Sequence, residues 1–143
     1  MTPDQLQDLE PGAKEFYASS KHLKGFDLAK FVAMWTQLIT SGTGVIFAMR
    51  DDEGQVQGAI SGVIYPEPYS EGLVATEFFW FVRPQHRGKG LDLYYRLEQW
   101  AKEKQASQIR MAHLCDLMPD GLKWLYGELG FEPIEILYAK DLP

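Results

Sequence analysis

The sequence predicts an α/β (α+β) fold in a single domain spanning 1–143, with helices packed on a mixed sheet. Three observations support this fold class. Segments with apolar residues at helical spacing are interspersed with short apolar runs of strand type, in the order α-α-β-β-β-α-β-α-β. Residues 73–83 form a nearly continuous apolar run, typical of a central strand covered on both faces. The chain is 45% apolar and 13% aromatic, which is enough for one packed core.

The N-terminal part predicts two helices after a polar lead-in at residues 1–10. Pro11 favours the start of a first helix over about 12–22. Asp27 is a suitable N-cap for a second helix over about 28–41. Apolar residues recur along this second helix at the intervals that one buried face requires. They are Leu28, Phe31, Val32, Trp35, Leu38 and Ile39.

Two strands follow, joined by a tight turn. Apolar and β-branched residues predict strands at Val45–Met49 and Val56–Tyr65. The segment between them, Asp51–Gly54, has the composition of a hairpin turn. Gly58 and Gly62 weaken the second of these strands and favour close packing or a bulge there.

The C-terminal half predicts further strands and helices in alternation. After the strand at 73–83, apolar residues at helical spacing predict a helix over about 90–104. Asp120 is suited to cap a helix over about 121–129. The remaining predicted elements are strands at Ile109–Leu114 and Ile134–Ala139.

Composition and charge narrow the class of protein. No apolar run is long enough to span a membrane, and the N-terminus lacks the pattern of a signal peptide, so we expect a cytoplasmic protein. A single cysteine, Cys115, excludes an internal disulfide and a cysteine-rich zinc site, and we expect no metal. The net charge of −6 argues against binding to nucleic acid and is compatible with a cationic substrate such as an amine.

The most informative segment is the glycine-rich turn after the strand at 73–83. Gly88 and Gly90 allow the backbone to approach a ligand closely, while Arg87 and Lys89 add positive charge. A helix follows at once, so its free N–H groups add positive potential, as a phosphate-bearing ligand requires. Two other glycine motifs do not fit, since the P-loop pattern is absent and Leu93 stands where a dinucleotide fingerprint needs its third glycine.

Two motifs at a suitable separation identify a family resemblance. The turn Gln85-His86-Arg87-Gly88-Lys89-Gly90 matches the pattern Q/R-x-x-G-x-G/A. Near the C-terminus, Leu125-Tyr126-Gly127-Glu128-Leu129-Gly130-Phe131 matches an aromatic-Tyr-x-x-x-Gly-Phe pattern. With the order of elements, these motifs make the chain resemble the GNAT superfamily of acetyl-CoA-dependent N-acetyltransferases, in particular the small stand-alone members found in bacteria and phages.

The resemblance implies a fold and a cofactor site. It implies a sheet of about six strands flanked by about four helices, in which the central strand splays from its neighbour to form an acetyl-CoA cleft. The pantetheine arm is expected along the strand edge at Phe81, Val82 and Arg83. The pyrophosphate is expected at the turn, where Gln85 is a weaker candidate. The N–H groups expected to face it are those of Arg87, Gly88, Lys89, Gly90 and Leu91.

The resemblance also implies direct acetyl transfer to an amine. Tyr126 occupies the position of the family's proton donor to the departing thiolate. Glu77 lies on the strand where a catalytic base is often found, although its parity relative to Val82 places it on the wrong face unless the strand contains a bulge. His113 and Asp116 are the reserve candidates, and ordered water is a further alternative.

Two departures from the family pattern carry expectations of their own. Pro119 stands where relatives often have Asn, some seven residues before the motif tyrosine. Only one predicted strand follows Phe131, where many relatives have two, so the sheet is expected to have an open edge. A second copy of the chain could complete that edge, so we expect a homodimer. A monomer is the alternative. We expect the acceptor to be selected by the first two helices, the loop at 22–28 and the loop at 65–72, which combines tyrosines with carboxylates.

Three functions are therefore consistent with the sequence. The first is an acetyl-CoA-dependent N-acetyltransferase acting on a primary amine. The second is a catalytically silent, GNAT-like module that binds acyl-CoA, and the third is a structural or assembly protein with the same topology.

Overall fold

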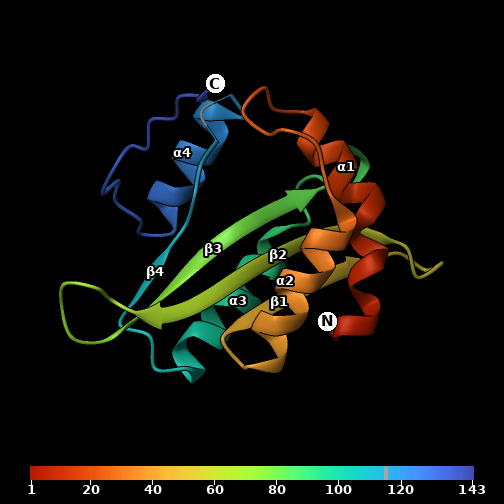
Figure 1. The fold of residues 1–143 in the computed structure, drawn as a ribbon. Helices are drawn as coiled ribbons and strands as arrows, with labels where there is room; N and C mark the ends of the chain where they lie inside the picture. Colours follow the sequence, from red (N-terminus) through yellow and green to blue (C-terminus); the bar gives the residue numbers. More distant parts are fainter. Residues whose placement is uncertain (115) are drawn as a thin grey trace. The chain divides into compact units, whose positions relative to one another are not determined.

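Four strands form one mixed sheet in the computed structural model of the protein, which describes residues 1–114 and 116–143 (Figure 1). The strand order is β1-β2-β3-β4, with β1, β2 and β3 antiparallel to their neighbours and β4 parallel to β3. Cys115 lies outside the described residues. The strands are β1 Gly44–Arg50, β2 Val56–Pro66, β3 Leu73–Val82 and β4 Gln108–Arg110.

The described residues also form four α-helices and two short 3-10 helices. The 3-10 helices are η1, Pro3–Leu9, and η2, Pro84–His86. The α-helices are α1 Glu10–Ala18, α2 Leu28–Thr40, α3 Leu91–Glu103 and α4 Pro119–Glu128. None of the helices in the described residues is long and apolar enough to cross a membrane.

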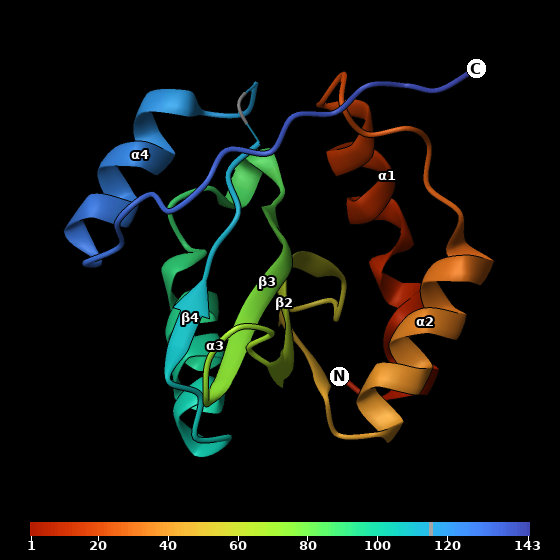
Figure 2. The same ribbon diagram turned by 60° about the vertical axis from the view of Figure 1, so that its left-hand side comes forward.

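The chain divides into two compact units, Met1–Ala112 and His113–Pro143, which we describe separately. In the first unit, α1 and α2 cover one face of the sheet and α3 covers the other (Figure 2). The second unit contains α4, and Phe131 N–H closes the end of this helix by donating to the Tyr126 carbonyl at 2.9 Å.

The face beneath α1 and α2 is aromatic. Trp35 of α2 is only 1% exposed, and its ring contacts Phe79 of β3 at 5.7 Å between centroids. Phe31 contacts the same two rings, and Phe16 of α1 contacts Phe81 of β3. Since buried aromatic side chains remove large apolar areas from water, this layer is the main core of the first unit.

The opposite face of the sheet packs closely on α3. A Cβ built at Gly62 of β2 would lie 2.5 Å from Leu97 Cδ1, so only glycine lets the helix approach this closely. This confirms the prediction that a glycine of the second strand serves close packing. The helix buries Leu93, Tyr94, Leu97 and Ala101, all of which belong to the apolar face predicted from the sequence.

Most predicted elements are confirmed in type and order. Asp27 caps α2 as predicted, since its carboxylate accepts a hydrogen bond from Lys30 N–H at 3.0 Å. The hairpin turn is also confirmed, and the Asp51 carboxylate accepts from Glu53 N–H and Gln55 N–H. Asp120 lies in the first turn of α4 rather than capping it, because the helix begins at Pro119, two residues earlier than predicted.

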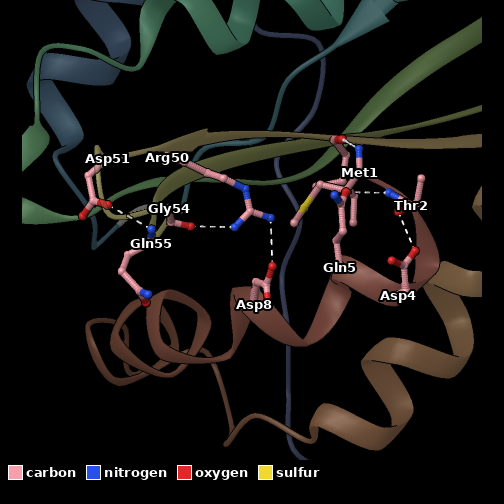
Figure 3. A network of polar contacts seen from close by, with 10 residues as sticks. Met1, Thr2, Asp4, Gln5, Asp8, Arg50, Asp51, Gly54 and Gln55 are labelled. Atoms are coloured by element: carbon pink, nitrogen blue, oxygen red, sulfur yellow. Dashed lines mark hydrogen bonds and ion pairs between the residues drawn. The ribbon is translucent and has the colours of Figure 1, made fainter.

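The prediction of a polar lead-in at residues 1–10 is wrong. Leu6 and Leu9 of η1 are fully buried, because the three-residue period of a 3-10 helix places both on one side. Polar contacts hold this segment on the sheet (Figure 3). Met1 N donates to the Ile46 carbonyl at 2.7 Å, and Arg50 Nη2 donates to Asp8 Oδ2 at 2.9 Å.

Two further boundaries differ from the sequence-based prediction. The first helix, predicted at 12–22, spans Glu10–Ala18 instead. The predicted strand at 134–139 is not formed, and the sheet in the described residues has four strands rather than about six. A strand needs a partner edge as well as a suitable sequence, and no described strand pairs with this segment.

Candidate active site

The edge of β3 that faces β4 is paired over only part of its length. Val74, Ala75 and Thr76 pair with Gln108, Ile109 and Arg110, and β4 then ends. From Glu77 to Val82, within the described residues, β3 pairs only with β2. The predicted strand at Ile109–Leu114 is therefore shorter than expected, and the second half of β3 has an edge of main-chain groups without a strand partner.

The register shows which residues present that edge. Arg83 N–H donates to the Gln57 carbonyl at 2.8 Å, and main-chain groups of successive strand residues point to opposite edges. The main-chain N–H and C=O groups of Arg83 and Phe81 therefore point toward β2, whereas those of Val82 and Trp80 point toward the open edge. Of the three residues predicted to bind the pantetheine arm through main-chain groups, Val82 is correctly oriented, while Phe81 and Arg83 are not. The Arg83 side chain forms an ion pair with Glu15 of α1 at 3.0 Å.

The glycine-rich turn follows this edge directly and leads through η2 to the N-terminus of α3. Gly88 has φ +92°, a conformation that only glycine adopts without strain. A Cβ built there would have no described atom within 4 Å, so the space beside this residue is open. The exposed side chains of Gln85, Arg87 and Lys89 surround it.

Gly90 has a packing role that the sequence did not show. Its φ of −81° is ordinary, but a Cβ there would lie 2.6 Å from Val82 Cγ2 and 3.4 Å from Trp80 Nε1. Gly90 is buried against β3, so its missing side chain lets the turn pack on the strand. This packing holds the open edge of β3 next to the N-terminus of α3.

Several N–H groups of the turn remain available for an anion. Lys89 N–H donates to the His86 carbonyl at 3.2 Å, and Arg87 N–H donates weakly to the Pro84 carbonyl at 3.5 Å. The N–H groups of Gly88, Gly90 and Leu91 make no hydrogen bond within the described residues. Gly88 and Gly90 precede α3 and Leu91 is its first residue, and the N–H groups of a first helical turn lack intrahelical acceptors, so these groups can bind an anion there.

Trp80 is a residue that the sequence analysis missed. Its Nε1 is a buried donor without a hydrogen-bond partner among the described residues, and it lies under Gly90. Buried indole N–H groups usually have a partner. The tryptophan in the strand was visible in the sequence, but only the structure places its donor beneath the glycine turn.

Glu77 lies on the same side of the sheet as α3. It pairs with Gly62, whose missing Cβ faces Leu97, and directly opposed residues of antiparallel strands share a face. Between the pairs Ile60–Trp80 and Gly62–Glu77, β3 contains one residue more than β2. This is a β-bulge, and it places Glu77 on the same face as Val82, as the sequence-based parity argument required.

The environment of Glu77 favours its neutral form. The side chain is 5% exposed, and burial raises the pKa of its carboxyl from 4.5 to about 7. Ala112 N–H donates to Glu77 Oε2 at 2.9 Å and partly opposes that shift. An acid with a pKa near neutrality can hold and release a proton at physiological pH.

Tyr126 belongs to the second compact unit, on α4. Its ring contacts Phe131 at 5.5 Å and His113 at 6.4 Å between centroids. His113 Nε2 forms a hydrogen bond of 3.2 Å with the Leu117 carbonyl, so one ring nitrogen of this reserve candidate is engaged within its own unit. Asp116 is exposed in the same unit. Among the described residues, no cluster of three or more His, Cys, Asp or Glu side chains could hold a metal ion.

The fold is of the α/β class, and its glycine-rich turn joins the open edge of β3 to the N-terminus of α3. The chain belongs to the acetyltransferase (GNAT) family, since the sequence profile of that family matches residues 7–131. The family recognised from the two motifs is thereby confirmed. A search of curated protein sequences gave no significant match.

Solved acetyltransferase structures share the fold at low sequence identity. An acetyltransferase from Trypanosoma brucei is 18% identical with a TM-score of 0.71, and covers 99% of this chain and 96% of its own. A ribosomal-protein-alanine N-acetyltransferase from Brucella melitensis is 16% identical with a TM-score of 0.68, covering 99% and 96%. Glucosamine-6-phosphate N-acetyltransferase from Arabidopsis thaliana is 16% identical with a TM-score of 0.69, covering 94% of each chain.

The residues present fit acetyl-CoA, which the family generally uses. The open edge at Val82 matches the amides of a pantetheine arm, and the unpaired N–H groups at Gly88, Gly90 and Leu91 match a pyrophosphate. The open space beside Gly88 and the buried Trp80 donor lie at the same turn.

Proposed function

We propose that the protein is an acetyl-CoA-dependent N-acetyltransferase that moves an acetyl group to a primary amine by direct transfer. The main support for the proposal is that three features follow one another in the structure: an open strand edge, a glycine turn with unpaired N–H groups and a helix N-terminus. These groups bind amides and phosphates through the main chain, where a ligand of this chemistry needs them.

When bound, acetyl-CoA would supply the acetyl group as an activated thioester. Val82 would hold the pantetheine arm by main-chain hydrogen bonds, and the N–H groups of Gly88, Gly90 and Leu91 would hold the pyrophosphate. Arg87 and Lys89 add formal positive charge at the exposed side of the turn. Arg83 and Phe81 support the site by fixing β3 against α1 and β2.

Glu77 is the proposed base. An amine must lose a proton before it can attack, and a carboxyl with a pKa of about 7 is ionised in about half of the molecules at neutral pH. It accepts the proton directly or through one water molecule. Burial is the main cause of the raised pKa of Glu77, and the hydrogen bond from Ala112 N–H partly opposes it.

Tyr126 is the proposed proton donor to the departing thiolate. A phenol is protonated at neutral pH and can donate without tuning. The role follows from the position of Tyr126 in the C-terminal family motif. Tyr126→Phe removes the hydroxyl alone, so it should spare acetyl-CoA binding and lower kcat.

The proposed acceptor is a primary amine. The similar structures include one named for an amino sugar phosphate and one named for a protein alanine, which share that chemistry. The loop after β2 is a candidate contact, since Tyr69 is exposed and Glu67 accepts a hydrogen bond from Ser70 at 2.6 Å. A homodimer and a cytoplasmic location remain proposals that rest on the sequence.

Calorimetric titration of acetyl-CoA and CoA into the purified protein tests the proposal. We expect saturable binding that Gly88→Val abolishes, because the substitution strains the turn and fills the open space. Gly54→Val is the matched control, since Gly54 has φ +81° and no described atom near its Cβ position, but lies in the β1–β2 hairpin. No binding by the unmodified protein would overturn the proposal, and binding without transfer to any of a panel of amines would favour a silent acyl-CoA module.

A further inference from the structure

Ser61 is a polar residue in the middle of the buried strand β2, with no exposed surface. It lies between Ile60 and Gly62, at the point where the register with β3 shifts. A buried hydroxyl costs free energy unless it is hydrogen-bonded. Its only described contacts of that kind are with the main chain of β3, so we asked what it holds there.

The hydroxyl of Ser61 hydrogen-bonds the bulge itself. Phe79 N–H donates to Ser61 Oγ at 3.0 Å, and the Ser61 hydroxyl is directed at the Phe79 carbonyl at 3.5 Å. In a bulge two residues oppose one, which leaves the regular ladder incomplete. The side-chain oxygen of Ser61 therefore accepts the hydrogen bond from Phe79 N–H that a main-chain carbonyl would accept in a regular ladder.

The bulge decides the face on which Glu77 lies. Phe78 and Phe79 both contact Trp35, so the two adjacent side chains lie on the α1–α2 face, which a regular strand would not allow. On the N-terminal side of Phe78 the side chains alternate between the two faces again, so Glu77 lies on the α3 face. If β3 had no bulge and Phe79 kept its position, regular alternation would place Glu77 on the same face as Phe79, against the aromatic core.

We propose that Ser61 is a positioning residue for Glu77: its hydroxyl anchors the extra residue of β3 and thereby keeps the Glu77 carboxyl buried on the α3 face. The catalytic consequence rests on the proposed function, in which Glu77 is the base. Ser61 itself lies on the opposite face of the sheet and does not contact the reacting groups.

The carboxyl titration of Glu77 in the ligand-free protein tests this inference. Carbon-13 NMR follows the carboxyl resonance with pH in the unmodified protein and in Ser61→Ala, with Glu77→Gln identifying the resonance. We expect the Ser61→Ala titration to move toward the ordinary value by about one pH unit or more, because a loosened bulge admits water to the carboxyl. An unchanged titration in folded Ser61→Ala would overturn the inference.

Two variants serve as controls. Ser61→Thr keeps the hydroxyl and should restore the titration of the unmodified protein. Ser107→Ala removes another serine hydroxyl that donates to β3, at the Leu73 carbonyl at the far end of the strand, and should leave Glu77 unchanged. A shift of equal size in Ser107→Ala would show that general loosening of β3, rather than the bulge, sets the titration, and would also overturn the inference.

Amide hydrogen exchange in the unmodified protein decides the matter if Ser61→Ala does not fold. The Phe79 amide should be protected to the degree of its paired neighbour Phe81. Exchange of the Phe79 amide at the rate of an exposed loop amide would overturn the inference.

Kinetics connects the inference to catalysis and separates it from the proposed function. If the protein transfers acetyl groups, Ser61→Ala should lower kcat about tenfold with KM for acetyl-CoA unchanged. A fall in kcat/KM through KM alone would overturn the catalytic part. Absence of acetyl-CoA binding by the unmodified protein would overturn the proposed function, while the titration and exchange measurements would still decide the role of Ser61.

Discussion

The two halves of β3 differ in what lies along their edges. Before the bulge, Val74–Thr76 pair with strands on both sides, and the buried Glu77 follows. After the bulge at Phe78 and Phe79, Trp80–Val82 pair with β2 alone and lead into the glycine turn. The half before the bulge ends in a buried carboxyl on the α3 face, whereas the half after it leaves main-chain groups at its open edge for a ligand. In β3, the side chain proposed for catalysis therefore lies before the bulge, and the main-chain groups proposed to bind the ligand lie after it.

The sharpest test of this separation is Glu77→Gln, which keeps the shape of the side chain and removes its acid function. We expect kcat to fall about 100-fold or more, because general base catalysis contributes on the order of 10²–10⁴. The Kd for acetyl-CoA should stay within about twofold, since the binding groups lie after the bulge. Steady-state assay of thiol release with a primary amine measures kcat, and calorimetry measures Kd. A kcat within about threefold of the unmodified protein would assign proton removal to water.

The burial of Glu77 also predicts how stability depends on pH. The folded-state pKa of about 7 lies above the ordinary value of 4.5, so the folded protein binds the extra proton between these two values. The stabilisation is fully present below pH 4.5 and is lost as pH rises through about 7. The loss should reach about 3 kcal/mol. Urea unfolding at pH 5 and pH 8 measures it, and Glu77→Gln should remove most of the difference. An equal pH dependence in both proteins would contradict the burial of Glu77.

The half of β3 after the bulge is tested by Gly90→Ala. The added methyl group would meet Val82 Cγ2, so we expect a loss of about 1–3 kcal/mol in the free energy of unfolding and weaker acetyl-CoA binding. The Glu77 titration should not change, because it belongs to the other half.

A double-mutant cycle gives this third prediction its control. Val82→Ala removes the methyl group that the new side chain would meet, so Gly90→Ala should cost less in its presence, by about 1 kcal/mol. Additive effects of the two substitutions, measured by urea unfolding, would contradict the close packing of the turn on β3.

Sequence reasoning located the features that local patterns define. The Asp27 cap, the hairpin turn at Asp51–Gly54 and the glycine turn each depend on residues close together in the chain, so their chemistry is visible in the sequence. The place of the glycine turn between β3 and α3, and that of the motif tyrosine on α4, could therefore be predicted. What the sequence could not supply was the orientation of Phe81 and Arg83, because the edge to which a main-chain group points depends on strand register.

By itself the sequence determined the order of the elements and the residues of the glycine turn, since helical and strand periodicity are short-range properties. Tertiary structure decided that Leu6 and Leu9 are buried, that Ile134–Ala139 forms no strand, and that Gly90 serves packing. It also decided the face of Glu77. That face depends on one extra residue in β3 and on a serine in the neighbouring strand, and only the paired strands bring these together.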